Sequence, residues 1–207
     1  MDLAAVQRAG FPMGGEPLVA LDLVDTLMTA VEPARDLLAT ADQRKAWWEV
    51  QAARLPASPA PDAVGVRRLR GAIRELLDAR VEGRAPDPTS VEDVNAVAAS
   101  VPVSPRLSYG SSAGAGGGVR MRTDLRWHTE HGGNVALAFI AREVIGLLGT
   151  PEEAERLRRC ANPACSMLFL AETKRRVWCA SNVCGNRVRV ARHQEKVRQE
   201  KQQGGER

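Results

Sequence analysis

The stretch Cys160-Ala-Asn-Pro-Ala-Cys165, followed thirteen residues later by Cys179-Ala-Ser-Asn-Val-Cys184, contains all four cysteines of the chain. Both pairs have the form C-A-x-x-x-C. Two tight turns that each present two sulfurs are what a tetrahedral thiolate site requires, and the spacing suits structural zinc. Because the protein would supply all four ligands, no coordination position is left for water, which favours scaffolding over catalysis. The sequence therefore predicts one structural Zn²⁺ held by Cys160, Cys165, Cys179 and Cys184.

Two other readings of the cysteines stay open at this point. A pair of disulfides, or a redox pair, would suit an oxidising compartment. Residues 1–12 contain no apolar run long enough for a secretory signal, and four unrelated thiols would not explain the repeat. No apolar run approaches the roughly 18 residues of a membrane span, so we expect a cytoplasmic protein with no membrane partner.

Charge is distributed unevenly along the 207 residues, whose formal net charge is +4. Residues 151–207 contain 13 Lys and Arg against 7 Asp and Glu, whereas the rest of the chain contains 16 against 18. A basic module beside a near-neutral domain suggests a polyanionic partner. The alternative is a solvated basic tail with no partner.

Outside the cysteine region, the apolar spacing predicts a mostly helical domain. Helices are expected over 33–40, over 41–54 after a cap at Thr40 or Asp42, over 62–81, over 91–99 after Ser90, and over 135–148 after Asn134. The apolar stretch beginning at Leu18 predicts a buried strand that runs into a turn near Asp25. Alternating residues over 106–109 and 119–127, on either side of a glycine-rich loop, predict a hairpin.

The fold class that follows is mainly α, in two parts. Residues 1–150 should form a helical N-terminal domain with a small β-hairpin or strand element, and residues 151–207 a four-cysteine zinc finger followed by a basic helix. Thr150, Pro151 and the two glutamates after them give a cap, an N1 proline and an acidic first turn. We expect the helix that starts there to deliver Cys160 to the metal.

The letters Cys184-Gly185-Asn186-Arg187 carry a family resemblance. With the four cysteines, Met167-Leu168-Phe169 and the basic run before Trp178, they resemble the CGNR zinc finger of bacterial proteins. In that family the finger follows a helical domain called ABATE, described as a stress-induced transcription regulator. Leu21-Asp22-Leu23-Val24-Asp25-Thr26 resembles an ABATE motif that usually has Asn where this chain has Asp25, and Ala171 stands where an acidic residue is usual. The resemblance implies zinc at the four cysteines and DNA binding by a bacterial transcription regulator.

The residues after the fourth cysteine suggest how DNA would be contacted. Gly185 can adopt a backbone angle that other residues resist, and Asn186 can cap the helix that follows. On that helix Arg189, Arg192 and Lys196 fall within about a 60° arc at 100° per residue, with an apolar stripe opposite that should face the finger. The candidate DNA contacts are Lys174, Arg175, Arg176, Arg187, Arg189, Arg192 and Lys196.

The remaining residues of the finger are expected to pack. Trp178 should lie against the zinc site rather than stack on a base. Leu168 and Phe169 should form the small core of the finger.

Three residues near the N-terminus, Asp22, Asp25 and Thr26, are capping or turn residues on the simplest interpretation and a ligand pocket on the second. Neither they nor His128 and His131 complete a catalytic set, so we do not expect an enzyme. A zinc-stabilised protein-interaction module without nucleic acid is the main alternative function, and a ligand-modifying enzyme that uses Asp22 and Asp25 is the third. A small-molecule effector in the N-terminal domain and a homodimer stay open as partners.

Overall fold

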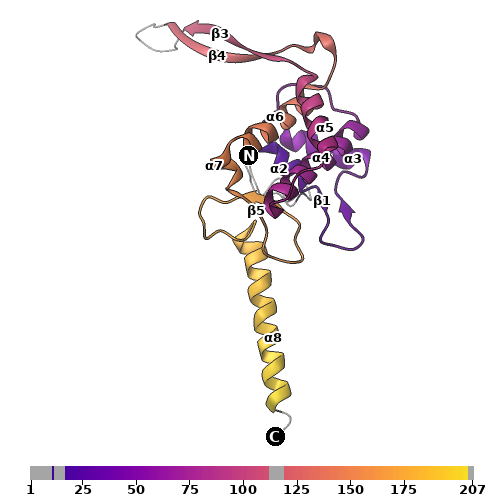
Figure 1. The fold of residues 1–207 in the computed structure, drawn as a ribbon, viewed down its shortest axis with the longest axis vertical. Coiled ribbons are helices and arrows are strands. Elements are labelled where there is room, and N and C mark those ends of the chain that lie inside the picture. Colours follow the sequence, from indigo (N-terminus) through magenta and orange to yellow (C-terminus); the bar gives the residue numbers. More distant parts are fainter. Residues whose placement is uncertain (1–10, 12–16, 112–118, 205–207) are drawn as a thin grey trace.

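The computed structural model describes residue 11 and residues 17–111 and 119–204. A body of packed helices occupies the centre of the molecule, a two-stranded ribbon projects from one end, and a single long helix projects from the other (Figure 1). None of the described helices is both long and apolar enough to cross a bilayer.

Helices make up most of the described chain, as the sequence predicts. They are α2 (Val19–Val24), α3 (Ala41–Gln51), α4 (Ala63–Glu82), α5 (Pro88–Ala99), α6 (Val135–Gly149), α7 (Pro151–Ala154) and α8 (Asn186–Gly204), with a 3₁₀ turn, η1 (Thr129–His131), and a π-helical turn, η2 (Ser181–Gly185).

Strands in the described residues form three separate antiparallel pairs. β1 (Leu27–Met28) pairs with β2 (Arg35–Asp36), β3 (Val103–Ser111) with β4 (Val119–Trp127), and β5 (Leu157–Arg159) with β6 (Leu168–Leu170). The β3–β4 pair is the predicted hairpin, and its first strand is longer at both ends than expected. The first two residues of the glycine-rich loop, Gly110 and Ser111, belong to β3, and residues 112–118 lie outside the described residues.

The main core is built by α2, α4, α5 and α6, with Trp47 of α3 fully buried at its side. α6 is the apolar helix that the sequence predicts over 135–148, and Asn134 caps it by accepting a hydrogen bond from the Leu137 amide. α4 begins at an Asp62 cap and ends at Gly83, whose φ of 68° closes the helix in the left-handed region. Thr40 and Gln43 form a capping box at the start of α3.

The segment after Leu18 is a helix, and the predicted buried strand is wrong. All six side chains of α2 are buried, so the apolar run has no polar face that would reveal its period. The helix packs against α4 and α6. In its first turn, the Ala20 amide, which has no partner within the helix, donates a hydrogen bond to Glu143 of α6. Burial on every side, rather than strand alternation, explains this apolar run.

Two smaller predictions are also wrong. Residues 33–40 form the short strand β2 and turns rather than a helix, because Asp36 there accepts two hydrogen bonds from Arg70 and one from the Leu38 amide. The cap of α5 is Asp87 followed by Pro88, one turn earlier than Ser90.

The chain beyond Thr150 forms a helix that ends after four residues, so it does not deliver Cys160. Strand β5 does, because the chain extends from Leu157 to pair with β6. Leu157, Leu168 and Leu170 from this hairpin belong to the main core, whereas Phe169 points to the other side. The hairpin is therefore shared between the helical body and the cysteine cluster.

Candidate metal centre and nucleic-acid interface

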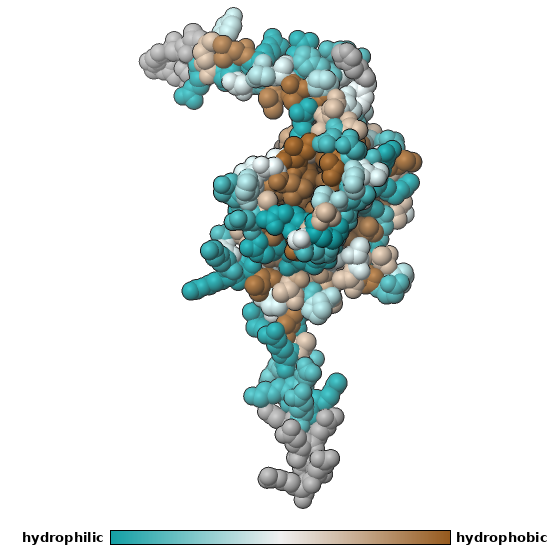
Figure 2. Space-filling model, in the orientation of Figure 1, coloured by the Kyte–Doolittle hydropathy of each residue, from teal (hydrophilic) through white to brown (hydrophobic). Residues whose placement is uncertain are grey.

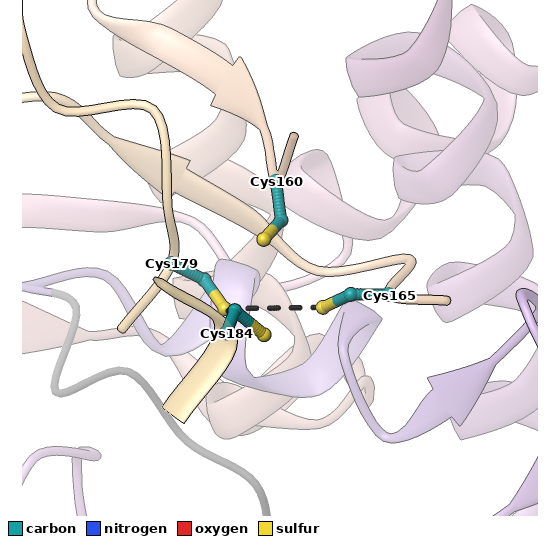
Figure 3. A group of neighbouring side chains, drawn as sticks. All are labelled: Cys160, Cys165, Cys179 and Cys184. Carbon is teal, nitrogen blue, oxygen red and sulfur yellow. Dashed lines mark hydrogen bonds between the residues drawn. The ribbon is translucent and has the colours of Figure 1, made fainter. Parts of the chain in front are cut away.

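Two chain reversals bring the four cysteines together (Figure 3). Cys160 follows β5, and Cys165 closes a tight turn in which its amide donates to the Asn162 carbonyl at 2.9 Å. Cys179 precedes η2, and Cys184 lies within that turn, with its amide donating to the Ala180 carbonyl at 2.9 Å. Each C-A-x-x-x-C segment thus folds as a turn that presents two sulfurs.

The sulfur atoms fit one tetrahedral ion. All four Sγ atoms lie within 4.8 Å of one another, with Cys165 to Cys179 at 3.8 Å and Cys179 to Cys184 at 3.6 Å. Zn–S bonds of about 2.3 Å place the sulfurs of a tetrahedron about 3.8 Å apart. Disulfides would need about 2.05 Å, and all four thiols are free, so the disulfide reading is not supported. The residues present fit a four-thiolate zinc site.

The electrostatics of the cluster also call for a cation. A hydrogen bond from Cys179 lowers the pKa of Cys165 to about 5, and the pKa of Cys179 rises in response. Burial raises the pKa of Cys160. Four thiols in mutual contact cannot all ionise without a positive ion among them, and Zn²⁺ would supply that charge. The single structural Zn²⁺ of the finger would hold the two turns together.

The finger has its own small core, which includes its buried cysteines. Phe169 is fully buried there with Ala171, and Met167 and Trp178 pack against them. Trp178 therefore lies beside the zinc site, as expected. Leu168 does not belong to this core, because successive residues of β6 point to opposite sides and Leu168 faces the helical body.

Arg176 is part of this small core rather than of the exposed loop. Its guanidinium donates to the carbonyls of Leu170 at 3.1 Å and Cys179 at 2.7 Å. Its charged end also lies 4.6 Å from the centre of the Phe169 ring. The side chain ties the loop to the cluster. Lys174 and Arg175, the other two basic residues of this run, are exposed.

The Cys-Gly-Asn-Arg segment has a different geometry from the one we expected. Gly185 has no positive φ; a Cβ there would make a tight contact of 3.2 Å with Cδ1 of Trp178, which a small shift of the ring would have to relieve. Asn186 does not cap a new helix, because η2 continues directly into α8 and the Asn186 side chain donates back to the Asn182 carbonyl at 2.9 Å. The Asn186 Oδ1 atom accepts a hydrogen bond from Arg189.

Helix α8 extends away from the rest of the molecule (Figure 1). Within the described residues, η2 is the one element against which it packs extensively. The predicted apolar stripe facing the finger is therefore wrong: Val190 is 55% exposed. The side chains of Arg187, Arg189, Arg192, Lys196 and Arg198 are all exposed. The zinc site thus presents one basic helix to solvent.

The three N-terminal candidates are all buried. Asp22 is ion-paired with Arg54 and accepts a hydrogen bond from the side-chain amide of Gln51 at 3.4 Å. The Thr26 hydroxyl accepts a hydrogen bond from Arg70 at 2.9 Å. Asp25 Oδ1 accepts a hydrogen bond from the Leu168 amide at 3.1 Å. These bonds to the chain's own groups favour a structural role.

Asp25 joins the N-terminal helix to the finger, which the sequence did not reveal. Its partner Leu168 is 143 residues away, on the strand that follows the second cysteine. Nearby, Ser166 accepts a hydrogen bond from the Thr29 amide at 3.0 Å. Burial raises the pKa of Asp25 well above its usual value, because few groups offset the loss of water.

A second connection between the finger and the body runs through arginines. Arg159 of β5 binds Asp78 at 3.1 Å and Glu82 at 2.7 Å, both on α4. Asp78 also pairs with Arg74, which is mostly buried. Arg74 and Asp78 are four residues apart on one helix, a spacing that favours their pair, whereas Arg159 is about 80 residues from its partners and its bonds have no local sequence signal.

Comparison with known families agrees with this architecture. Residues 18–151 match the ABATE family, whose description is "Putative stress-induced transcription regulator", and residues 156–197 match the CGNR zinc finger. No curated protein matches the chain.

Proposed function

Since the chain belongs to the ABATE family, we propose that it is a DNA-binding transcription regulator of the bacterial cytoplasm, whose contact with DNA depends on zinc. The observation that carries the proposal is α8, an isolated basic helix that grows out of the cysteine cluster. We further propose residues 1–150 and 151–207 as its two parts.

Charge and exposure of α8 support a polyanionic partner. The helix contains six Lys and Arg and two Glu. A helix that packs on so little of the body gains little stability from tertiary contacts. Phosphates along one side of it would offset the repulsion among its basic side chains and favour the ordered helix.

The position of α8 supports groove binding. Arg189, Arg192 and Lys196 share one side of a helix long enough to lie in a major groove or to follow the phosphates. Arg187 lies at its root, and Lys174 and Arg175 are exposed on the preceding loop of the finger. We propose these six residues as DNA contacts. Arg176 is left out because its guanidinium is bound to carbonyls of the finger.

The alternative, a protein-interaction module, is less well supported for α8. Protein interfaces have an apolar centre with few charges. On the described part of α8, Val190 is the one exposed large apolar side chain, and it stands among basic residues. We therefore propose nucleic acid as the partner of this helix.

The test is the salt dependence of binding to duplex DNA, measured by fluorescence anisotropy with zinc-loaded protein. Replacing Arg189, Arg192 and Lys196 together by Ala should lower the slope of log K against log[salt] by about 2 to 3, because each phosphate contact contributes about 0.9. Zinc content and melting temperature should stay near wild type, since the three side chains are exposed.

A matched control removes three exposed basic side chains from the N-terminal domain: Arg35, Lys45 and Arg67, each changed to Ala. It lowers the net charge equally and should leave the slope unchanged. If the α8 variant and the control lose affinity to the same extent, the effect is one of net charge and α8 is not the contact. If wild-type protein shows no binding at low salt, the DNA proposal fails.

A further inference from the structure

The β3–β4 ribbon has two chemically different faces. Residues paired across an antiparallel ladder point to the same side, so the pairs Leu107–Thr123, Tyr109–Met121 and Pro105–Leu125 share one face. Four large apolar side chains on this face are mostly exposed: Leu107 by 66%, Tyr109 by 79%, Met121 by 56% and Leu125 by 61%. We call it the apolar face of the ribbon.

The opposite face is basic. The pairs Ser104–Arg126, Arg106–Asp124, Ser108–Arg122 and Gly110–Arg120 place four arginines there with one acid. Asp124 accepts hydrogen bonds from Ser108 at 2.5 Å and from Arg122 at 3.3 Å, so part of this face is already ordered by its own polar groups. The two faces differ like those of a sheet that packs one face on a core and exposes the other to solvent.

Among the described residues, the ribbon packs on the body at its base. Trp127 lies edge-on to Phe139 of α6 at 6.4 Å between ring centres, and Arg142 lies 6.0 Å from the Trp127 ring. Beyond this base the ribbon projects into solvent, and Figure 2 shows apolar residues along it. A two-stranded ribbon alone is marginally stable in water, and large apolar side chains gathered on one exposed face usually mark an interface.

We propose that the apolar face of the ribbon is a dimerisation surface, on which the ribbons of two copies of this chain pack face to face about a twofold axis. A symmetric pair needs one self-complementary patch, and an exposed apolar face meets that need. The basic faces then point outward, so the arginines keep their water and like charges stay apart. The ribbon and α8 lie at opposite ends of the molecule, so both copies of α8 remain free (Figure 1).

The area involved suits a dimer of moderate affinity. Four exposed apolar side chains on each copy would remove roughly 1,000 Å² from water in total, near the lower bound for a specific interface. We therefore expect a dimer that dissociates in the micromolar range.

The test is the molar mass of zinc-loaded, full-length protein by light scattering and sedimentation, from about 1 to 200 µM. Wild type should pass from monomer to dimer. Tyr109→Glu with Leu125→Glu should raise the dissociation constant about 100-fold or more, because two hot-spot side chains would be replaced by charges. Arg120→Gln with Arg126→Gln makes the same change in net charge on the basic face and should dimerise like wild type.

Cysteine cross-linking gives a second, independent readout. Thr123 and Arg122 are neighbours on opposite faces, and both are exposed. With zinc bound, Thr123→Cys should form a disulfide-linked dimer and Arg122→Cys should not. Unchanged circular dichroism and zinc content would show that each variant folds. A wild type that stays monomeric at 200 µM, a dimer that survives the glutamate pair, or equal cross-linking at both positions would each overturn the proposal.

Discussion

Replacement of Asp25 tests whether the helical body and the zinc finger form one stability unit. Asp25 lies at the end of α2, and its Oδ1 accepts the Leu168 amide at 3.1 Å. Asp25→Ala removes the acceptor, and Asp25→Asn keeps one oxygen in its place. The two variants therefore separate the hydrogen bond from the buried charge.

The expected magnitudes follow from burial. Asp25 is 4% exposed and Leu168 is fully buried, so the Leu168 amide has no access to water once the acceptor is gone. An unsatisfied buried donor costs about 1–3 kcal/mol. We expect Asp25→Ala to be less stable than Asp25→Asn by that amount. The strand after Cys165 should then be held less firmly, so Asp25→Ala should also release zinc faster than Asp25→Asn.

The charge acts in the opposite direction. Burial raises the pKa of Asp25, so the folded state favours the neutral carboxyl, and wild type loses stability as the pH rises through the folded pKa. Asp25→Asn has no charge to bury. Its stability relative to wild type should therefore increase from pH 5 to pH 8.

The measurements are urea unfolding of zinc-loaded protein at several pH values and zinc transfer to a coloured chelator. If Asp25→Ala and Asp25→Asn unfold with equal free energies, the hydrogen bond to Leu168 contributes nothing. If only the finger responds and the helical body melts as before, the two parts are independent.

Three further changes test other features of the structure. Cys179→Ser should abolish zinc binding and unfold the finger, because structural zinc supplies roughly 10 kcal/mol or more to such sites. Elemental analysis should show that zinc is lost, and proteolysis should show that α4–α6 stay folded but are less stable. Complete loss of the helical circular dichroism signal would contradict this prediction. Gly185→Ala places a Cβ 3.2 Å from Trp178 and should cost about 1 kcal/mol in thermal stability, whereas an unchanged melting temperature would show that the ring moves freely. Burial raises the pKa of Glu143 to about 7. The free energy of unfolding of Glu143→Gln, measured in urea, should therefore increase relative to wild type by up to about 3 kcal/mol between pH 4.5 and pH 8. A difference that stays constant over this pH range would refute the assignment.

Much of the fold could be predicted from the sequence because the patterns that indicate its helices and its ribbon involve residues close together in the chain. Apolar residues at helical spacing located α4 and α6, and capping residues located the starts of α3 and α6. Alternation located the β3–β4 ribbon and also the residues on each of its faces. These signals depend only on neighbours in the chain, so no distant contact was needed to read them.

Three of the failures share one cause, which is burial or pairing by distant residues. The sequence of α2 predicts a strand because α4 and α6 cover the helix, so its apolar side chains show no helical period. Residues 33–40 do not form the predicted helix because Arg70, far along the chain, holds Asp36 in an extended segment. The strand that leads to Cys160 depends on its pairing with β6.

The sequence by itself determined the metal site, because a thiolate ligand set is specified by residue type and by the spacing that lets each short turn present two sulfurs. It also determined that a basic segment follows the fourth cysteine. The tertiary structure alone decided which charges are available. Arg176 is bound to carbonyls of the finger and Asp25 to a strand amide, whereas the arginines of α8 remain exposed. The sequence determines which residues are charged. The packing around each charged side chain determines whether it is exposed to solvent and to partners.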